Sequence, residues 1–374
     1  MPTKLTDETL LAMYRMMALL RRFEEKAGQA YGQKKIQGFC HLYIGQEAVA
    51  VGTQYALEPD DYMLTGYRDH AHPIARGAHP GMIMAELFGR YGGYSKGRGG
   101  SMHLFDVEHH WYGGYGIVGG QIPLAAGMAF ASKYRGEDRV TVCSFGDAAA
   151  NQGSFHETFN MASKWKLPVI YVCENNRYGM GTDIARVSAE AEIYKRAVAY
   201  KMRGEKVDGQ DVLAVYEMMK DLADHCRSGK GPVLLEMNTY RYRGHSMSDA
   251  ATYRTKEEVE EERANKDPIL RLKDHLLKKR IASESGLEKL HEDINKECDE
   301  AIAFADASPE PPLEELYGDH YVNPEDPDDK PRERVLGAKD VKWPSYPKGN
   351  ELKVTWDLEP KTPVKAAPAR KGAA

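Results

Sequence analysis

The chain has 374 residues, 42% of them hydrophobic, which is enough to bury a substantial core in one large or two smaller domains. Its net charge of -5 and the lack of a continuous apolar run of about 18 residues exclude a transmembrane helix, and nothing indicates binding to nucleic acid or membranes. The 5 cysteines have no CxxC or metal-type spacing, so we expect reduced thiols.

The amino terminus predicts a helix that begins near Thr6. Threonine is a good helix cap, and Leu10, Tyr14 and Met17 follow it on one helical face. The residues before this helix are polar, and they contain neither a signal-peptide core nor an arginine-rich transit sequence. We therefore expect a cytoplasmic protein.

A strand, a helix and a second strand are predicted over residues 139–176. Residues 139–145 form an apolar, β-branched run that ends at Gly146, as in a buried parallel strand. Residues 168–173 form a similar run before Asn175 and Asn176. A helix from about residue 151 to residue 165 is expected between them, because apolar side chains recur there at helical spacing. These are Phe155, Phe159 and Ala162, with Met161 and Trp165 beside them on the same side.

The ends of these two strands predict a magnesium-diphosphate site. A right-handed crossover returns the second strand parallel to the first, so Asp147 and Asn176 face one crevice. A carboxylate and an amide oxygen suit Mg²⁺, which often completes its octahedral shell with phosphate oxygens. The small residues Ala148 and Ala149 leave backbone amides at the start of the helix open to phosphate.

The same residues also have a purely structural interpretation. Asp147 could cap the helix, and Asn175 and Asn176 could form an ordinary turn. The glycine-rich run over residues 113–120 is not a GxGxxG fingerprint, and it too could be turn chemistry.

Strand and helix signals alternate to about residue 240, which predicts an α/β fold with a doubly wound, mostly parallel sheet flanked by helices. Residues 255–305 are charged and helical in character, and Glu257 to Glu262 are expected to form a solvated face. We assign residues 1–320 to one domain and 321–359 to a carboxyl-terminal extension. Residues 360–374 are basic and of low complexity, so we expect a disordered tail.

Several motifs in the right order resemble the family of pyruvate dehydrogenase alpha subunits, which belong to the first component of a multienzyme complex. The resemblance implies a transketolase-like domain that binds the diphosphate of thiamine diphosphate. It extends from about residue 5 to about residue 320. The matching segments are 38–42, 45–48, 67–70, 99–103, 116–119, 145–153, 159–162, 165–168, 174–182 and 240–249.

The resemblance implies a role for each matching residue. The ligands of Mg²⁺ would be the side chains of Asp147 and Asn176 and the carbonyl of Tyr178. The residues around the diphosphate would be Tyr67, Arg68, Gly146, Asp147, Ala148, Ala149, Asn176 and Arg241. Fixed cationic donors suit a dianion, although an arginine is more often a surface residue.

The resemblance also places residues near the reactive end of the cofactor. Gly116 and Val118 would contact the aminopyrimidine ring through their backbone. His41 and His245 would be the active-site histidines, and proton transfers there need groups that titrate near neutrality. His41 could instead be a core histidine. Ala148 stands where the family usually has glycine, so we expect a negative φ there and unimpaired diphosphate binding.

The implied activity is the oxidative decarboxylation of pyruvate and the reductive acetylation of lipoamide on the dihydrolipoyl acetyltransferase, leading to acetyl-CoA. The implied cofactors are thiamine diphosphate and Mg²⁺. The glutamate that activates the cofactor belongs to a partner beta subunit in this family, and Glu47 is not given that role. We therefore expect a heterotetramer of two alpha and two beta subunits that receives the lipoyl domain.

Other functions compete with this one. The alpha subunit of acetoin dehydrogenase shares the site, and residues 151–157 favour it slightly, whereas residues 246–249 and 309–316 favour pyruvate. A branched-chain 2-oxo acid fits less well. A magnesium-dependent phosphohydrolase would need a second aspartate where Ala149 stands. A non-catalytic phosphate-binding module is the remaining alternative.

Overall fold

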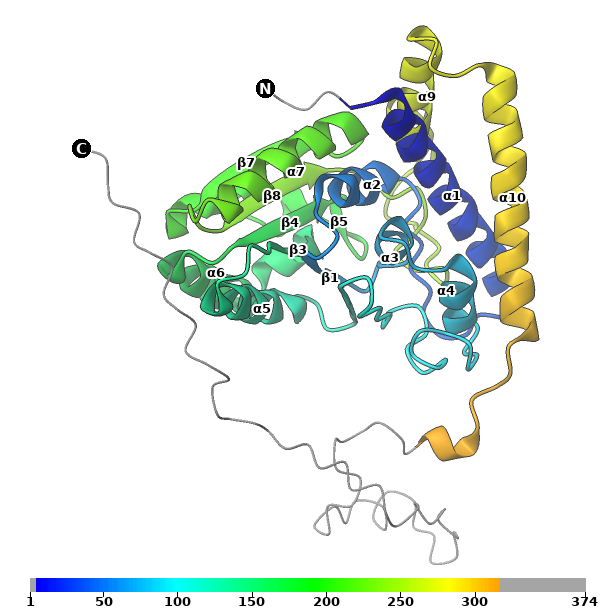
Figure 1. The fold of residues 1–374 in the computed structure, drawn as a ribbon, viewed down its shortest axis with the longest axis horizontal. Coiled ribbons are helices and arrows are strands. Elements are labelled where there is room, and N and C mark those ends of the chain that lie inside the picture. The colour runs from blue at the N-terminus through cyan, green and yellow to red at the C-terminus, as the bar shows by residue number, and fades with distance from the viewer. Residues whose placement is uncertain (1–4, 317–374) are drawn as a thin grey trace, which may run out of the picture. The chain divides into compact units, whose positions relative to one another are not determined.

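A sheet of 6 parallel strands lies at the centre of the molecule (Figure 1). The computed structural model describes residues 5–316. The order of the strands is β2-β1-β3-β4-β8-β7, which confirms the predicted doubly wound parallel sheet. The strands are β1 (Tyr62–Gly66), β2 (Trp111–Tyr115), β3 (Thr141–Gly146), β4 (Val169–Asn175), β7 (Arg203–Asp208) and β8 (Val233–Asn238).

Helices cover both faces of this sheet. Alternate side chains of β4 point to opposite faces, so Tyr171 packs under α5, α6 and η3 while Val172 packs under α2 and α7. The helices are α1 (Asp7–Gly32), α2 (Glu47–Ala56), α3 (Ala71–Ala75), α4 (Pro80–Leu87), α5 (Gln121–Arg135), α6 (Gly153–Trp165), α7 (Val212–Arg227), α8 (Lys256–Lys266), α9 (Pro268–Lys278) and α10 (Glu284–Ala307). The shorter elements are the 3₁₀ helices η1 (Asp147–Asn151), η2 (Ile184–Arg186) and η3 (Ile193–Tyr200) and the hairpin strands β5 (Tyr178–Gly179) and β6 (Thr182–Asp183).

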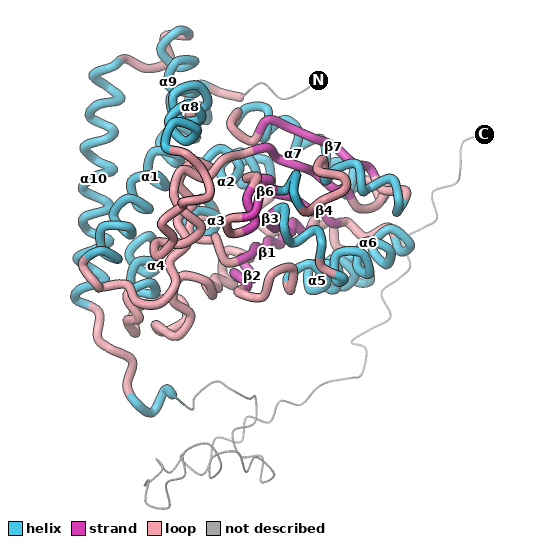
Figure 2. The backbone as a smooth tube through the Cα atoms, turned by 180° about the vertical axis from the view of Figure 1, so that it is seen from behind, coloured by secondary structure: helices cyan, strands magenta, loops and turns pink. Residues whose placement is uncertain are grey.

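The first helix forms as predicted. The Thr6 hydroxyl accepts a hydrogen bond from the Thr9 amide and caps α1, and Leu10, Tyr14 and Met17 are buried. Helix α10 packs along α1 and α4 at the side of the sheet (Figure 2). The acidic residues of α8 are more than a solvated face. Glu258 accepts hydrogen bonds from the Tyr178 and Tyr240 hydroxyls at 2.9 and 2.8 Å.

The predicted strand-helix-strand unit is confirmed, with two corrections. Strands β3 and β4 are parallel neighbours. The α-helix begins at Gly153 rather than near residue 151, because Asp147–Asn151 form the separate 3₁₀ helix η1. The expectation that Met161 and Trp165 share the buried side is wrong, since they are 37% and 48% exposed.

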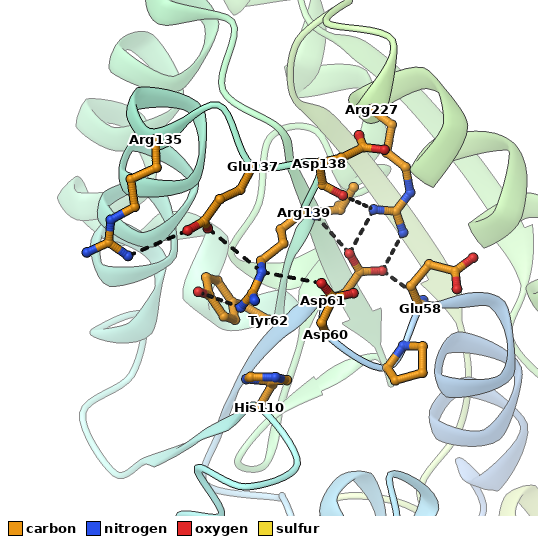
Figure 3. Close-up of polar contacts among 12 residues, drawn as sticks. Glu58, Asp60, Asp61, Tyr62, His110, Arg135, Glu137, Asp138, Arg139 and Arg227 are labelled. Atoms are coloured by element: carbon orange, nitrogen blue, oxygen red, sulfur yellow. Dashed lines mark hydrogen bonds and ion pairs between the residues drawn. The ribbon is translucent and has the colours of Figure 1, made fainter. Parts of the chain in front are cut away.

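A charged cluster ties the amino ends of β1 and β3 to the end of α7 (Figure 3). Asp61 is fully buried, and its two carboxylate oxygens pair with Arg227 at 2.8 and 2.5 Å. They also accept hydrogen bonds from the backbone amides of Val140 and Glu58 at 2.8 and 2.9 Å. Paired charges thus cover the amino ends of these strands, and the opposite, carboxyl ends are open to a ligand.

Residues up to Pro311 form one compact unit, and the 3₁₀ helix η4 (Leu313–Leu316) belongs to a second unit. The predicted boundary at residue 320, the extension over 321–359 and the tail over 360–374 lie outside the described residues. No helix within residues 5–316 has both the length and the apolar character needed to cross a membrane. All 5 cysteines are buried and unpaired.

Candidate active site

A pocket opens at the carboxyl ends of β1, β3 and β4. Strands β2 and β3 lie on opposite sides of β1, so the winding of the chain reverses there. Ligands of open α/β sheets bind at such a switch point. The predicted site residues that line the pocket are Tyr67, Arg68, Val118, Gly146, Asp147, Ala148, Ala149, Asn176, Tyr178 and Arg241.

The three residues predicted to bind a metal come together in this pocket. Asp147 follows β3, Asn176 follows β4 and Tyr178 begins β5. The Asn176 Oδ1 atom and the Tyr178 carbonyl both accept hydrogen bonds from Arg241 Nη1, at 3.2 and 2.5 Å. Two of the predicted ligand oxygens therefore converge on one positive charge. Residues 5–316 contain no metal-type cluster of three His, Cys, Asp or Glu side chains, as expected for a set with a single carboxylate.

Arg241 is a buried cation without a carboxylate partner. Its side chain is 1% exposed, its Nε has no hydrogen-bond partner, and none of the described residues forms an ion pair with it. Its guanidinium instead donates to the carbonyls of Tyr178 and Met180, to Asn176 and to the Tyr253 hydroxyl. An unpaired buried charge is costly, so this position calls for an anion. The surface-residue interpretation is wrong for Arg241.

Arg68 adds a second cation to the pocket. It donates to the carbonyls of Leu42 and His245 at 2.7 and 2.8 Å, so it also joins the two segments that carry the predicted histidines. Burial lowers the pKa of Arg68, and the positive charge of Arg241 lowers it further. Two guanidinium groups that repel each other in one pocket favour a ligand with more than one negative charge.

Asp147 and the residues after it lie in η1. Burial raises the pKa of Asp147 to about 6, against the attraction of Arg241. Asp147 caps no helix, since η1 begins after Gly146 and α6 after Gln152. The predicted contribution of the α6 dipole is therefore wrong, because Ala148 and Ala149 belong to η1 instead. Ala148 has no positive φ, as expected.

The turn interpretation is right for Asn175 and not for Asn176. The Asn175 Oδ1 atom accepts a hydrogen bond from the Arg177 amide at 3.1 Å, and its Nδ2 donates to Glu236 at 2.6 Å. Asn176 turns toward the pocket.

His41 and His245 contact the ring of Tyr67 and do not line the pocket themselves. The ring centroid of His41 is 4.6 Å from that of Tyr67 and 5.1 Å from that of His245. Burial, together with the charge of Arg68, lowers the pKa of His41 to about 2 and that of His245 to about 4. Both are therefore neutral at pH 7, contrary to the expectation of groups that titrate near neutrality. Their Nδ1 atoms have no partner among the residues described.

Of the two residues predicted to contact an aminopyrimidine ring, one lines the pocket and the other does not. Val118 lines the pocket and is 41% exposed. Gly116 is half-buried behind it, and a Cβ at this position would lie 3.0 Å from the His103 ring. The structure therefore brings Val118 to the pocket and leaves Gly116 at its margin.

Five polar residues of the pocket had no predicted role: Gln46, Thr65, Gln121, Ser144 and Glu174. Glu174 is the next-to-last residue of β4, and its position near the carboxyl end of a strand was the signal for it. Its carboxylate accepts hydrogen bonds from Tyr43 and His72, both at 2.9 Å. Glu47 lies elsewhere, since its carboxylate is paired with Arg21 and is absent from the pocket lining, which supports withholding a cofactor role from it.

The residues present fit a divalent cation with a diphosphate. Arg241 and Arg68 offer positive charge that the described part of the chain does not neutralise. Asp147 offers a buried carboxylate, and burial raises its pKa against the attraction of Arg241. Gly146 and Ala148 keep the entrance free of large side chains.

The doubly wound sheet and the cationic pocket at its switch point define a class of α/β proteins that bind a phosphorylated cofactor at the sheet edge. More specifically, the chain belongs to the dehydrogenase E1 component family, which matches residues 15–314. This confirms the family resemblance seen in the motifs.

The chain is similar to proteins named pyruvate dehydrogenase E1 component subunit alpha. The one from Rhizobium meliloti is 54% identical over 314 residues, which cover 84% of this chain and 90% of the relative. The one from Zymomonas mobilis is 52% identical over 311 residues, covering 83% and 88%. The somatic, mitochondrial form from Bos taurus is 51% identical over 322 residues, covering 86% and 82%.

Proposed function

We propose that this chain is the alpha subunit of a pyruvate dehydrogenase, the E1 component of a multienzyme complex. The reaction is the oxidative decarboxylation of pyruvate with reductive acetylation of lipoamide on the dihydrolipoyl acetyltransferase. The names of the relatives support the substrate. The observation that carries the proposal is the buried, unpaired Arg241 bonded to Asn176 and Tyr178 beside Asp147.

The proposed cofactor is thiamine diphosphate with Mg²⁺. When bound, thiamine diphosphate supplies the nucleophilic carbon and the electron sink for decarboxylation. Asp147, Asn176 and the Tyr178 carbonyl hold the metal. The diphosphate is held by Tyr67, Arg68 and Arg241, by the backbone of Gly146, Ala148 and Ala149, and the ring by Gly116 and Val118.

His41 and His245 act at the substrate end of the site. Both are neutral, so each carries one N–H and one free lone pair. A neutral histidine donates a hydrogen bond to a developing oxyanion, and the lowered pKa values make both rings donors rather than bases. Tyr67, which lines the pocket, contacts both rings, with centroids 4.6 Å from His41 and 5.6 Å from His245.

The partner is a beta subunit in an α₂β₂ heterotetramer, which supplies the activating glutamate. The carboxylates that line the pocket are Asp147 and Glu174, and Glu174 is engaged by Tyr43 and His72. Ile117 is 78% exposed beside the lining residue Val118, which leaves apolar surface for a partner. The assembly receives the lipoyl domain of the acetyltransferase. We place it in the cytoplasm, and we treat residues 1–320 as one domain.

The test is the reduction of an artificial electron acceptor by this chain copurified with its beta partner, with thiamine diphosphate and Mg²⁺. We expect turnover with pyruvate, far less with acetoin or a branched 2-oxo acid, and a loss of at least about 100-fold in Asp147→Ala. Preference for acetoin would overturn the substrate and leave the cofactor site standing. Binding of the cofactor without turnover of any substrate would overturn the catalytic assignment.

A further inference from the structure

Gln46 lies directly before α2, and its side chain is wholly buried at the wall of the pocket. Its Oε1 atom accepts a hydrogen bond from Asn176 Nδ2 at 2.9 Å. Its Nε2 atom is buried and has no hydrogen-bond partner among residues 5–316. Buried amide donors are nearly always paired, so this donor indicates a missing acceptor.

Arg241 fixes the donor and acceptor direction of the hydrogen bonds that run from it through Asn176 to Gln46. The guanidinium of Arg241 has only donors, so the Asn176 atom that it contacts at 3.2 Å must be Oδ1. Asn176 therefore presents its Nδ2 donor to Gln46, and Gln46 must accept with Oε1. The remaining atom, Nε2, is then a donor as well. A flipped Gln46 would place two donors against each other.

Neither helix capping nor internal pairing of both side-chain ends explains why Gln46 is buried. Gln46 occupies the cap position of α2, yet its side chain makes no capping hydrogen bond. Gln54 on the same helix shows the ordinary case, because its Oε1 accepts from Arg76 at 3.0 Å and its Nε2 contacts Met63 sulfur. Gln46 differs in having one end tied to a proposed metal ligand and the other end free.

We propose that Gln46 is an unassigned residue of the cofactor site with two roles. Its Oε1 fixes the amide of Asn176 so that Oδ1 faces the metal position. Its Nε2 donates a hydrogen bond to a phosphate oxygen of the bound diphosphate. The inference rests on the proposed function, because it names a further ligand of that same site.

The experiment uses the full chain assembled with its beta partner, and it measures binding rather than turnover. The dissociation constant of thiamine diphosphate is determined by calorimetry at saturating Mg²⁺, and the Mg²⁺ requirement at saturating thiamine diphosphate. Gln46→Met keeps the size of the side chain and removes both hydrogen bonds. Gln46→Glu keeps the acceptor for Asn176 and replaces the donor with a negative charge. Gln54→Met is the matched control.

We expect Gln46→Met to weaken thiamine diphosphate binding by at least about tenfold, as for one hydrogen bond to a charged group. It should also raise the Mg²⁺ requirement, because the Asn176 amide then keeps only its hydrogen bond from Arg241 and is held less firmly. Gln46→Glu should weaken the diphosphate at least as much and leave the Mg²⁺ requirement within about threefold of the wild type. Gln54→Met should lower thermal stability and change neither binding constant.

The proposal and the proposed function fail in different ways. If the wild type binds no thiamine diphosphate, both are overturned. If the wild type binds it and the two Gln46 variants bind it as tightly, Gln46 has no such role and the function stands. If Gln54→Met loses as much affinity as Gln46→Met, the effect is general damage to α2 and the proposal falls. Should Gln46→Met fail to assemble, Gln46→Glu decides the donor role by itself.

Discussion

Single residues of the pocket are held in states that the isolated chain does not favour. Arg241 is 1% exposed and forms no ion pair with a described residue, and burial raises the pKa of Asp147 to about 6. A phosphate anion would pair with the Arg241 cation, and a metal cation would stabilise the charged form of the Asp147 carboxylate. These two residues thus match the two charges of the proposed cofactor. Stability is given up at such sites in exchange for binding.

The neutral state of His41 has a measurable consequence for stability. Its pKa is lowered to about 2 in the folded protein, whereas an unfolded histidine titrates near 6.5. Unfolding therefore takes up a proton below about pH 6.5, and the stabilising contribution is present above that pH and is lost as the pH falls. Between pH 6 and pH 5 we expect the wild type to lose about 1.2 kcal/mol more than His41→Asn.

Urea unfolding of the cofactor-free protein at several pH values checks this expectation. His275→Asn, which changes a half-buried histidine on α9, is the control and should keep the wild-type slope. Equal slopes for His41→Asn and the wild type would show that His41 is already charged in the folded state.

Ala148 is packed against Gly179 on the neighbouring hairpin. A Cβ on Gly179 would lie 2.7 Å from the Ala148 Cβ, which is too close for two carbon atoms. We expect Gly179→Ala to cost about 1–3 kcal/mol of stability and to weaken cofactor binding, because η1 must shift. The double change Ala148→Gly with Gly179→Ala should recover most of the loss.

Thermal melts and calorimetric titration with thiamine diphosphate measure these effects. Gly127→Ala, where an added Cβ has nothing within 4 Å, is the control and should not destabilise the protein. If the double variant is as weak as Gly179→Ala, the two residues are not coupled in this way.

At the scale of elements, the amino ends and the carboxyl ends of the parallel strands differ in function. At the amino ends, Asp61 accepts four hydrogen bonds. Two come from Arg227 and two from backbone amides. The carboxyl edge carries η1 and the turn after β4, which are short segments positioned by the strands before them. Arg196 supports η1 by donating to the Ala150 carbonyl at 2.8 Å. The amino ends of the strands thus carry contacts that stabilise the fold, and the carboxyl ends carry the proposed binding site.

Asp61→Asn separates these two tasks. The change leaves the Arg227 guanidinium partly buried without a counter-charge, so we expect a loss of about 3 kcal/mol in the free energy of unfolding. Cofactor affinity in the folded protein should stay within about twofold, because the pocket lies at the opposite edge. Asp60→Asn changes an exposed partner of Arg139 and should cost less than about 1 kcal/mol. Denaturant unfolding and calorimetry decide, and equal losses for Asp60 and Asp61 would contradict the assignment.

At the scale of the whole molecule, the described chain provides the proposed metal and diphosphate end of a site. Val118, which lines the pocket, and its neighbour Ile117 are 41% and 78% exposed. Apolar side chains exposed beside a binding pocket indicate contact with another protein. This agrees with a subunit whose proposed partner completes the site.

Ile117→Asp tests this arrangement without disturbing the core. We expect the variant to fold as the wild type does and to associate with the beta partner at least about tenfold more weakly, with a parallel loss of cofactor affinity. Val198→Asp on η3, at 79% exposure, is the control. Analytical ultracentrifugation of the mixed subunits measures the association. Unchanged assembly of Ile117→Asp would remove this surface from the interface.

Much of the site was predictable because its residues follow strand ends. Asp147 and Asn176 stand at the carboxyl ends of two apolar runs, and parallel strands bring such ends together. The roles of Tyr67, Arg68, Arg241, His41 and His245 came from family resemblance, since no local pattern marks them. Gln46 was missed because its significance depends on contacts with Asn176, which is far from it in the sequence.

The sequence by itself determined the α/β class, the strand-helix-strand unit and the approach of Asp147 to Asn176, because periodicity and strand parallelism act over short stretches of chain. Only the tertiary structure decided that Arg241 is buried without a counter-ion, that both histidines are neutral, that η1 precedes α6, and that Gln46 keeps a free donor. Charge state and hydrogen-bond direction depend on the packing of segments far apart in the chain, which local pattern does not encode.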